Sequence, residues 1–163
     1  MSGNGRPQVK IFTDGACKGN PGPGGYAALL LCGDKRKEVA GGFRLTTNNR
    51  MEIMACIAAL EKLRYPSEVT LTSDSRYVVD AMTKGWAKSW RAKGWKRGSN
   101  EPAQNPDLWE RLLALCETHQ VRFEWVRGHD GHEENEWCDG ISVEWSNRDD
   151  LPPDPGYPPR GSR

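Results

Sequence analysis

The order of the predicted elements constrains the fold more than any other feature of the chain, because three strand-like runs come before any helical periodicity. The runs are Val9–Thr13, Tyr26–Cys32 and Lys37–Arg44. The first is separated from the second by GNPGPGG, in which nearly every residue favours a turn. The third follows the second after a short link. Short connections join antiparallel neighbours, so the sheet is expected to begin with two hairpins.

Helices and strands alternate in the rest of the chain. A helix capped by Asn49 is expected, because apolar residues then recur at helical spacing as far as Leu63. The later expected elements are a strand over Glu68–Thr72, a helix over Ser75–Met82, the Trp-rich segment Trp86–Trp95, a helix starting at Asn105-Pro106, a strand over Val121–Val126 and a final helix over about 133–145. Hairpins followed by alternating helices and strands predict an α/β fold with a mixed sheet covered by helices.

Four acidic residues lie where these expected elements meet: Asp14, Glu52, Asp74 and Asp139. Three of them adjoin apolar runs, where a carboxylate costs free energy unless something pairs with it. Carboxylates gathered at one point raise each other's pKa and need cations to stay ionised. Hard divalent ions such as Mg²⁺ suit clustered oxygens. The pattern is therefore typical of a metal-dependent phosphoryl-transfer enzyme.

Each acidic residue also has a structural interpretation. Asp14 with Gly15 is a common turn dipeptide, and Glu52 stands three residues after Asn49, the spacing of a capping box. Asp74 could cap the helix that follows it, and Asp139 lies in an acidic segment where surface charges are usual. The structural interpretation requires four coincidences, whereas one metal site explains all four residues.

Two histidines in GHDGH allow a second metal hypothesis. His129 and His132, with Cys138 as a third ligand, could bind zinc, but structural zinc sites use tighter, repeated spacings. A histidine on a glycine-flanked loop is better suited to proton transfer near neutral pH. We therefore assign His129 to catalysis.

Basic and aromatic residues interleave between Trp86 and Arg97, with no acidic residue among them. Tryptophans can anchor such a segment while the cationic heads contact phosphates. The residues expected to bind nucleic acid here are Trp86, Lys88, Trp90, Arg91, Lys93, Trp95, Lys96 and Arg97. The formal net charge of the chain is only +1, so the local patch matters more than the total.

The remaining features bound the domain and its compartment. The 163 residues fit one domain, expected over 8–148, with a flexible N-terminus over 1–7 and a disordered Pro/Gly-rich tail over 149–163. Five widely spaced cysteines without a CxxC motif indicate a reduced, cytoplasmic protein. The sequence shows no signal core or membrane-spanning run, and a monomer without membrane association is expected.

The chain resembles type 1 ribonucleases H of the cellular, bacterial kind. The matching stretches are IFTDGACKGNPGPGGYAALL, TTNNRMEIMACIAALEKL, TSDSRYV, GWAKSWRAKGWK, NPDLWERL and WVRGHDGHEENEWCD, which occur in the family's order. The resemblance implies a ribonuclease H-like fold with a five-stranded mixed sheet and helices on both faces. It also implies an endonuclease that hydrolyses the RNA strand of RNA–DNA hybrids to give 5′-phosphate and 3′-hydroxyl ends.

The resemblance also implies roles for particular residues. Asp14, Glu52, Asp74 and Asp139 would hold two Mg²⁺ ions about 4 Å apart, with Mn²⁺ as the alternative ion. His129 would be the mobile catalytic histidine. The implied contacts to the hybrid are Cys17, Asn20, Thr47, Asn48, Asn49 and Arg76.

Two other functions stay open at this point. Nucleases acting on DNA share this type of fold, so the fold alone does not fix the substrate. The run DGISVEWSNRDD departs from the family where a small-residue helix is usual, and Gly140 should weaken that helix. A hybrid-binding module with weak catalysis is therefore the second alternative.

Overall fold

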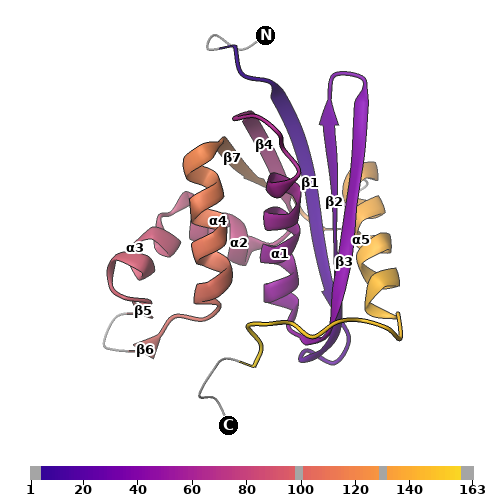
Figure 1. Cartoon of the computed structure of the whole chain (residues 1–163), viewed down its shortest axis with the longest axis vertical. Helices are drawn as coiled ribbons and strands as arrows, with labels where there is room; N and C mark the ends of the chain where they lie inside the picture. Colours follow the sequence, from indigo (N-terminus) through magenta and orange to yellow (C-terminus); the bar gives the residue numbers. More distant parts are fainter. Residues whose placement is uncertain (1–4, 98–100, 129–131, 159–163) are drawn as a thin grey trace.

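The computed structural model describes residues 5–97, 101–128 and 132–158. Its main sheet has five strands in the order β3-β2-β1-β4-β7 (Figure 1). These are β1 (Gln8–Cys17), β2 (Gly22–Cys32), β3 (Lys35–Thr46), β4 (Glu68–Ser73) and β7 (Gln120–Trp125). The first three pair antiparallel, whereas β4 runs parallel to both β1 and β7. The mixed sheet that begins with two hairpins is confirmed.

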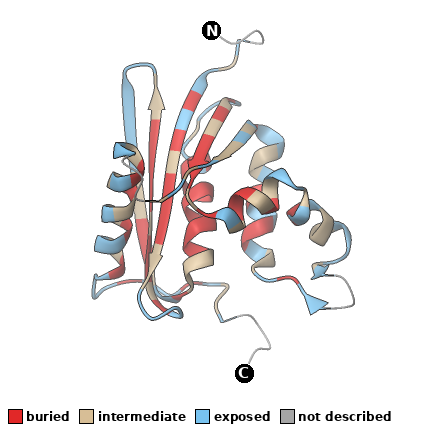
Figure 2. Ribbon diagram, turned by 180° about the vertical axis from the view of Figure 1, so that it is seen from behind, coloured by how far each residue is buried: buried red, intermediate tan, exposed pale blue. Residues whose placement is uncertain are grey.

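Helices cover both faces of the sheet. The helices are α1 (Asn48–Glu61), α2 (Arg76–Thr83), α3 (Trp86–Ala92), α4 (Pro106–Thr118) and α5 (Glu133–Ser146). Helix α1 packs on β1 and β2 from one side and α4 packs on α1, while α5 packs on β1, β2 and β3 from the other side (Figures 1 and 2). A two-stranded ribbon, β5 (Lys96–Arg97) with β6 (Glu101–Pro102), follows α3. No described helix has the length and apolar character needed to cross a bilayer.

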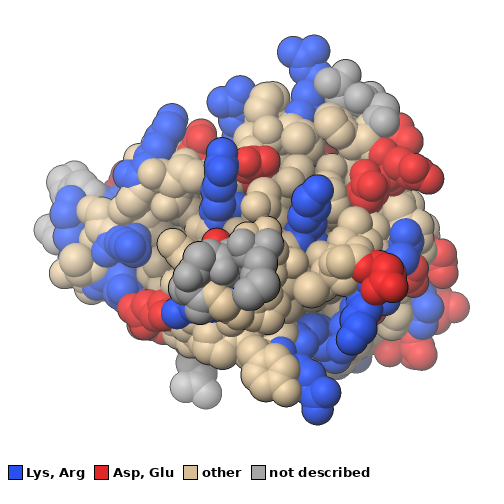
Figure 3. All heavy atoms as spheres, turned by 90° about the horizontal axis from the view of Figure 1, so that it is seen from above, with Lys and Arg blue, Asp and Glu red and all other residues tan. Residues whose placement is uncertain are grey.

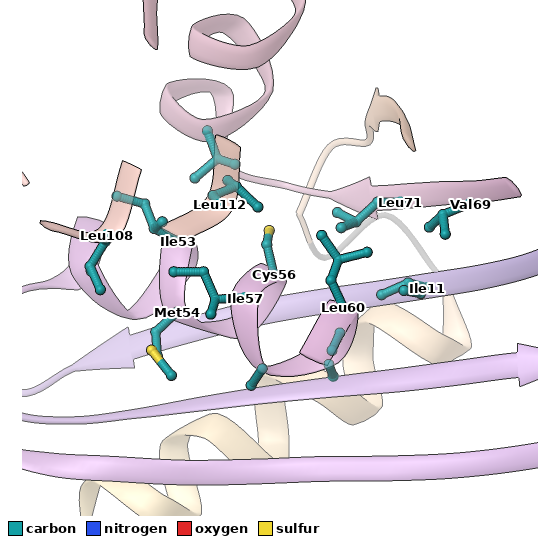
Figure 4. Packing of buried hydrophobic residues seen from close by; sticks show 14 of the residues in the cluster. Ile11, Ile53, Met54, Cys56, Ile57, Leu60, Val69, Leu71, Leu108 and Leu112 are labelled. Atoms are coloured by element: carbon teal, nitrogen blue, oxygen red, sulfur yellow. The ribbon is translucent and has the colours of Figure 1, made fainter. Parts of the chain in front are cut away.

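Helix α1 is the centre of the core. Every residue from Arg50 to Leu60 is buried, because the helix is enclosed by the sheet on one side and by α4 on the other. Ile53, Ile57 and Leu60 project among side chains of β1, β4 and α4 (Figure 4). Buried residues run through the central strands and α1, as Figure 2 shows. This packing fixes α1 against β1, and each of these two elements carries one of the four acidic residues.

The start of α1 differs from the sequence prediction. Thr47 caps the helix, because its side-chain oxygen accepts a hydrogen bond from Arg50 N at 3.2 Å, so Asn49 lies inside the first turn. Glu52 therefore stands five residues after the cap and cannot complete a capping box. Ser75 caps α2 in the same way, by accepting a hydrogen bond from Val78 N. Glu52 and Asp74 therefore do not have the capping roles that the structural interpretation gave them.

The C-terminal segment also differs from the prediction. Residues 149–158 pack against the domain instead of forming a disordered tail, and Leu151 and Asp154 are buried. Asp154 accepts hydrogen bonds from Thr46 and from the buried Arg50, both at 2.7 Å. The prolines of this segment restrict the unfolded chain, which lowers the entropy lost when the segment docks. Low hydrophobicity predicted disorder, but a buried ion pair and an apolar contact hold this short segment.

Candidate active site

A glycine on β1 allows the first two acidic residues to meet. A Cβ atom on Gly15 would lie 2.6 Å from the backbone nitrogen of Glu52, so only glycine lets α1 approach β1 this closely. Gly15 N also donates to Asp14 Oδ1 at 2.8 Å, which orients the carboxylate. The alternative interpretation of this dipeptide as a turn is wrong, because both residues lie inside β1.

The third and fourth carboxylates approach from β4 and α5. Asp74 follows the last residue of β4, which runs parallel to β1 beside it. One carboxylate oxygen from each of Asp14, Glu52 and Asp74 lies within 4.8 Å of the others. Asp139 belongs to α5, and it lies near enough to Asp14 for its charge to raise the pKa of the Asp14 carboxyl group. The structure thus brings together all four acidic residues that the sequence singled out, and we call them the carboxylate cluster.

The electrostatics of the carboxylate cluster are unfavourable without a cation. Burial, followed by the charges of Asp74 and Asp139, raises the pKa of Asp14 from 3.8 to about 8. Burial and the charges of Asp14 and Asp74 raise the pKa of Glu52 well above its usual range. In addition, Glu52 Oε1 is buried without a hydrogen-bond partner among the described residues. Clustered carboxylate oxygens with an unused acceptor fit a hard divalent cation.

The alternative zinc site finds no support in the described part of the chain. Cys138 is buried in α5, and its thiol contacts the carbonyl oxygen of Phe12 at 3.4 Å. His132 is exposed, immediately before α5. Over the ranges that the structure describes, the one group of possible metal ligands belongs to the carboxylate cluster. His129 lies outside the described residues, so its assignment to catalysis stays a prediction.

The predicted hybrid contacts around the β1–β2 turn form one surface. Asn48 N donates to Asn20 Oδ1 at 2.9 Å, which ties that turn to the start of α1. The Cys17 thiol contacts the carbonyl oxygen of Thr46 at 3.5 Å. The cap and first turn of α1, Thr47–Asn49, continue this surface along the helix that carries Glu52. Arg76 belongs to a different element, the exposed start of α2.

The basic segment forms a separate surface over α3, which packs on α2 and α4. Several Lys and Arg side chains project among uncharged residues in this part of the molecule, on the left in Figure 3. Trp90 lies against Trp109 with ring centroids 6.1 Å apart, and Trp95 packs against the core, so both anchor the segment as predicted. Trp86 is exposed, with the Lys84 ammonium 5.3 Å from its ring centroid.

The basic side chains of this segment are not equivalent. Arg91 forms ion pairs with Glu110 and Glu117, and Arg97 forms one with Glu101. These contacts partly neutralise the two arginines. Three exposed lysines have no ion pair with any described residue, and they are the side chains best placed to contact phosphates: Lys88, Lys93 and Lys96.

Several residues of the site escaped the sequence analysis. Asn135 lies one helical turn before Asp139 and is buried, and its side-chain amide has no hydrogen-bond partner among the described residues. Trp125, at the end of β7, donates its indole N–H to the carbonyl oxygen of Asp74 at 3.1 Å. A Cβ atom on Gly128 would lie 2.8 Å from Asp74 Oδ2, so this glycine allows the loop after β7 to approach the carboxylate. Asn135 lies in the acidic segment and Trp125 in the predicted strand Val121–Val126, but neither pattern marks these uncharged residues as part of a site.

The chain is similar to known proteins over nearly all of its length. A family model described as RNase H matches residues 6–146. The chain is 59% identical to a ribonuclease H of Trichodesmium erythraeum over 93% of this chain and 97% of that protein. It is 62% identical to a ribonuclease H of Syntrophus aciditrophicus over 93% and 87% of the two chains.

Solved structures agree with these relatives. The crystal structure of LC9-RNase H1, described as a type 1 RNase H with the type 2 active-site motif, superposes with a TM-score of 0.77 at 34% identity. The match covers 86% of this chain and 72% of that one. The fold, the carboxylate cluster and these similarities agree, and the chain belongs to the ribonuclease H family.

Proposed function

We propose that this chain is an endoribonuclease that hydrolyses the RNA strand of RNA–DNA hybrids and leaves 5′-phosphate and 3′-hydroxyl ends. Membership of the ribonuclease H family supports the reaction class. The observation that carries the proposal is the carboxylate cluster, in which three carboxylate oxygens lie within 4.8 Å of one another. A module that only binds polyanions gains nothing from clustered buried carboxylates, since they repel phosphates.

The cofactor we propose is Mg²⁺, bound as two ions by Asp14, Glu52, Asp74 and Asp139, with Mn²⁺ as the alternative ion. Oxygen donors of this kind suit both ions. Bound Mg²⁺ supplies charge neutralisation at a phosphate and makes a water molecule more acidic. The protein contributes the geometry, because Gly15 lets α1 approach β1 closely and so brings Glu52 near Asp14.

Substrate recognition is proposed to divide between two surfaces. The surface of Cys17, Asn20 and Thr47–Asn49 adjoins α1 and is suited to the RNA strand, where 2′-hydroxyl groups distinguish RNA from DNA. The lysines over α3 are suited to the phosphates of the DNA strand, which requires no sequence specificity. His129 is proposed to assist proton transfer or product release.

The cellular setting is proposed from weaker observations. All five cysteines are free, as expected for a reducing compartment, so we propose a cytoplasmic enzyme. The hydrophobic core is built from helices and strands of one chain, and we propose a monomer.

A cleavage assay with strand-specific labels tests the proposed function. RNA–DNA hybrid, duplex DNA and duplex RNA of one sequence are incubated with the protein and Mg²⁺, and the ends of the products are identified. We expect cleavage of the RNA strand of the hybrid alone. Cleavage of duplex DNA would favour a DNA nuclease, and hybrid binding without cleavage would favour a binding module.

A further inference from the structure

The edge of the Trp125 indole ring contacts the backbone of Asp74, a member of the carboxylate cluster. Trp125 is the last residue of β7 and is paired with Ser73, the last residue of β4. Its indole Nε1 donates to the carbonyl oxygen of Asp74 at 3.1 Å, and Val126 N donates to the carbonyl oxygen of Ser73 at 3.0 Å. Two successive carbonyl groups, those of Ser73 and Asp74, therefore accept hydrogen bonds from the end of β7. They lie where β4 ends, next to the Asp74 carboxylate of the cluster.

The face of the same ring carries a cation. The guanidinium carbon of Arg76 lies 3.9 Å from the centroid of the Trp125 ring, within the range of a cation–π contact. Both side chains are exposed, and Arg76 is only two residues from Asp74. A guanidinium is a planar fork of donors that matches a phosphate, and a stacked guanidinium loses less rotamer freedom when it binds.

We propose that Trp125 is a positioning residue that couples phosphate recognition to the metal site. The edge of its indole fixes the backbone of Asp74, and its face holds Arg76 ready to bind a backbone phosphate of the nucleic acid. This inference rests on the proposed function, since it concerns the same site. It assigns separate duties to the N–H and to the ring of one side chain, and substitution can separate them.

Trp125→Phe removes the N–H and keeps an aromatic face. We expect the Mg²⁺ concentration for half-maximal cleavage to rise about threefold to tenfold, the size expected for one lost hydrogen bond. KM for the hybrid should stay within about twofold of the parent value, since the cation–π contact persists. Calorimetric titration of the free protein with Mg²⁺ should show the same loss of affinity, and this readout does not depend on turnover.

Arg76→Gln removes the cation and keeps the indole hydrogen bond. KM should rise about fivefold or more while the Mg²⁺ dependence stays unchanged. The slope of log affinity against log salt, measured in chelator by fluorescence anisotropy, should fall by slightly less than one, as for one lost phosphate contact. Arg36→Gln is the matched control, because it removes an arginine that lies 5.5 Å from the Trp137 ring on another element. It should change neither quantity.

The results can overturn the proposal in two ways. If Trp125→Phe matches the parent in Mg²⁺ affinity and cleavage, the indole only fills space at the end of β7. If Trp125→Phe and Arg76→Gln show the same defect, the two duties are not separable and the assignment is wrong. A parent protein that binds Mg²⁺ but does not cleave hybrid would refute the proposed function instead, and the calorimetric comparison would still decide the role of Trp125.

Discussion

Replacing Asp14 by Asn should stabilise the metal-free protein at neutral pH. In the fold, burial and the neighbouring carboxylates raise the pKa of Asp14 from 3.8 to about 8. The unfolded chain therefore releases a proton that the folded chain retains. The stability that this group contributes is complete below pH 3.8 and is lost as the pH rises to about 8.

The size of the effect follows from this shift. Each pKa unit corresponds to about 1.4 kcal/mol, so at pH 7 the upper limit for Asp14 is about 4 kcal/mol. The other carboxylates of the cluster share the repulsion, and we expect Asn to recover about 1–3 kcal/mol of unfolding free energy. For a domain of this length that amounts to roughly 3–10 °C in melting temperature. The amide oxygen of Asn can still accept the hydrogen bond from Gly15 N.

Thermal unfolding in chelator from pH 3 to pH 9 measures the difference. The stabilisation by Asp14→Asn should vanish below about pH 4 and grow toward pH 8. Asp34→Asn is the matched control, because it removes an exposed carboxylate in the turn between β2 and β3, outside the carboxylate cluster, and should not reproduce the stabilisation seen with Asp14→Asn. An Asp14→Asn protein that is no more stable than the parent at pH 8 would refute the account of a strained carboxylate cluster.

Four further results are expected. Asp154→Asn should lower the unfolding free energy by about 3 kcal/mol, because it breaks a buried ion pair with Arg50. A loss of less than about 1 kcal/mol in a urea titration would contradict the docking of residues 149–158 against the domain. Gly140→Ala should raise stability by about 0.5–1 kcal/mol, since the position is helical and a Cβ meets nothing within 4 Å; an unchanged melting temperature would contradict this. His129→Ala should slow turnover by about 10²-fold with hybrid affinity intact, and bound zinc that disappears with the histidine would show another role. Lys88, Lys93 and Lys96 should be replaced together by Gln. The slope of log affinity for the hybrid against log salt should then fall by about 0.9 for each lost phosphate contact, whereas an unchanged slope would show that these lysines do not contact the hybrid.

The strands and helices were predictable because their apolar patterns are local. The run Tyr26–Cys32 lies inside β2. The apolar stripe lies inside α1 from Ile53 to Leu60, and its last member, Leu63, follows the end of the helix. The carboxylate cluster was predictable too, since parallel strands and the helix between them bring the ends of elements together. The final helix forms as far as Ser146 despite Gly140, because α5 packs along β1 and β2.

The details that escaped prediction depend on tertiary contacts. Thr47, Asn48 and Asn49 stand in a row before Arg50, and each is a residue type that can cap a helix. Only the packing of α1 decides for Thr47. The docking of Asp154 requires the buried guanidinium of Arg50, which comes from a distant part of the sequence. The hydrogen bond from Trp125 to Asp74 likewise requires the pairing of β4 with β7. No local pattern encodes such pairings.

The central claim is that the carboxylate cluster makes hybrid cleavage depend on a divalent cation. The most direct measurement is single-turnover cleavage of labelled RNA–DNA hybrid against Mg²⁺ concentration, with the parent and with Asp14→Asn proteins shown to be folded. We predict that the parent is inactive in chelator and saturable by Mg²⁺, and that Asp14→Asn is inactive at every Mg²⁺ concentration while it still binds the hybrid. Cleavage by folded Asp14→Asn at a rate near that of the parent, or parent cleavage that persists in chelator, would contradict the claim.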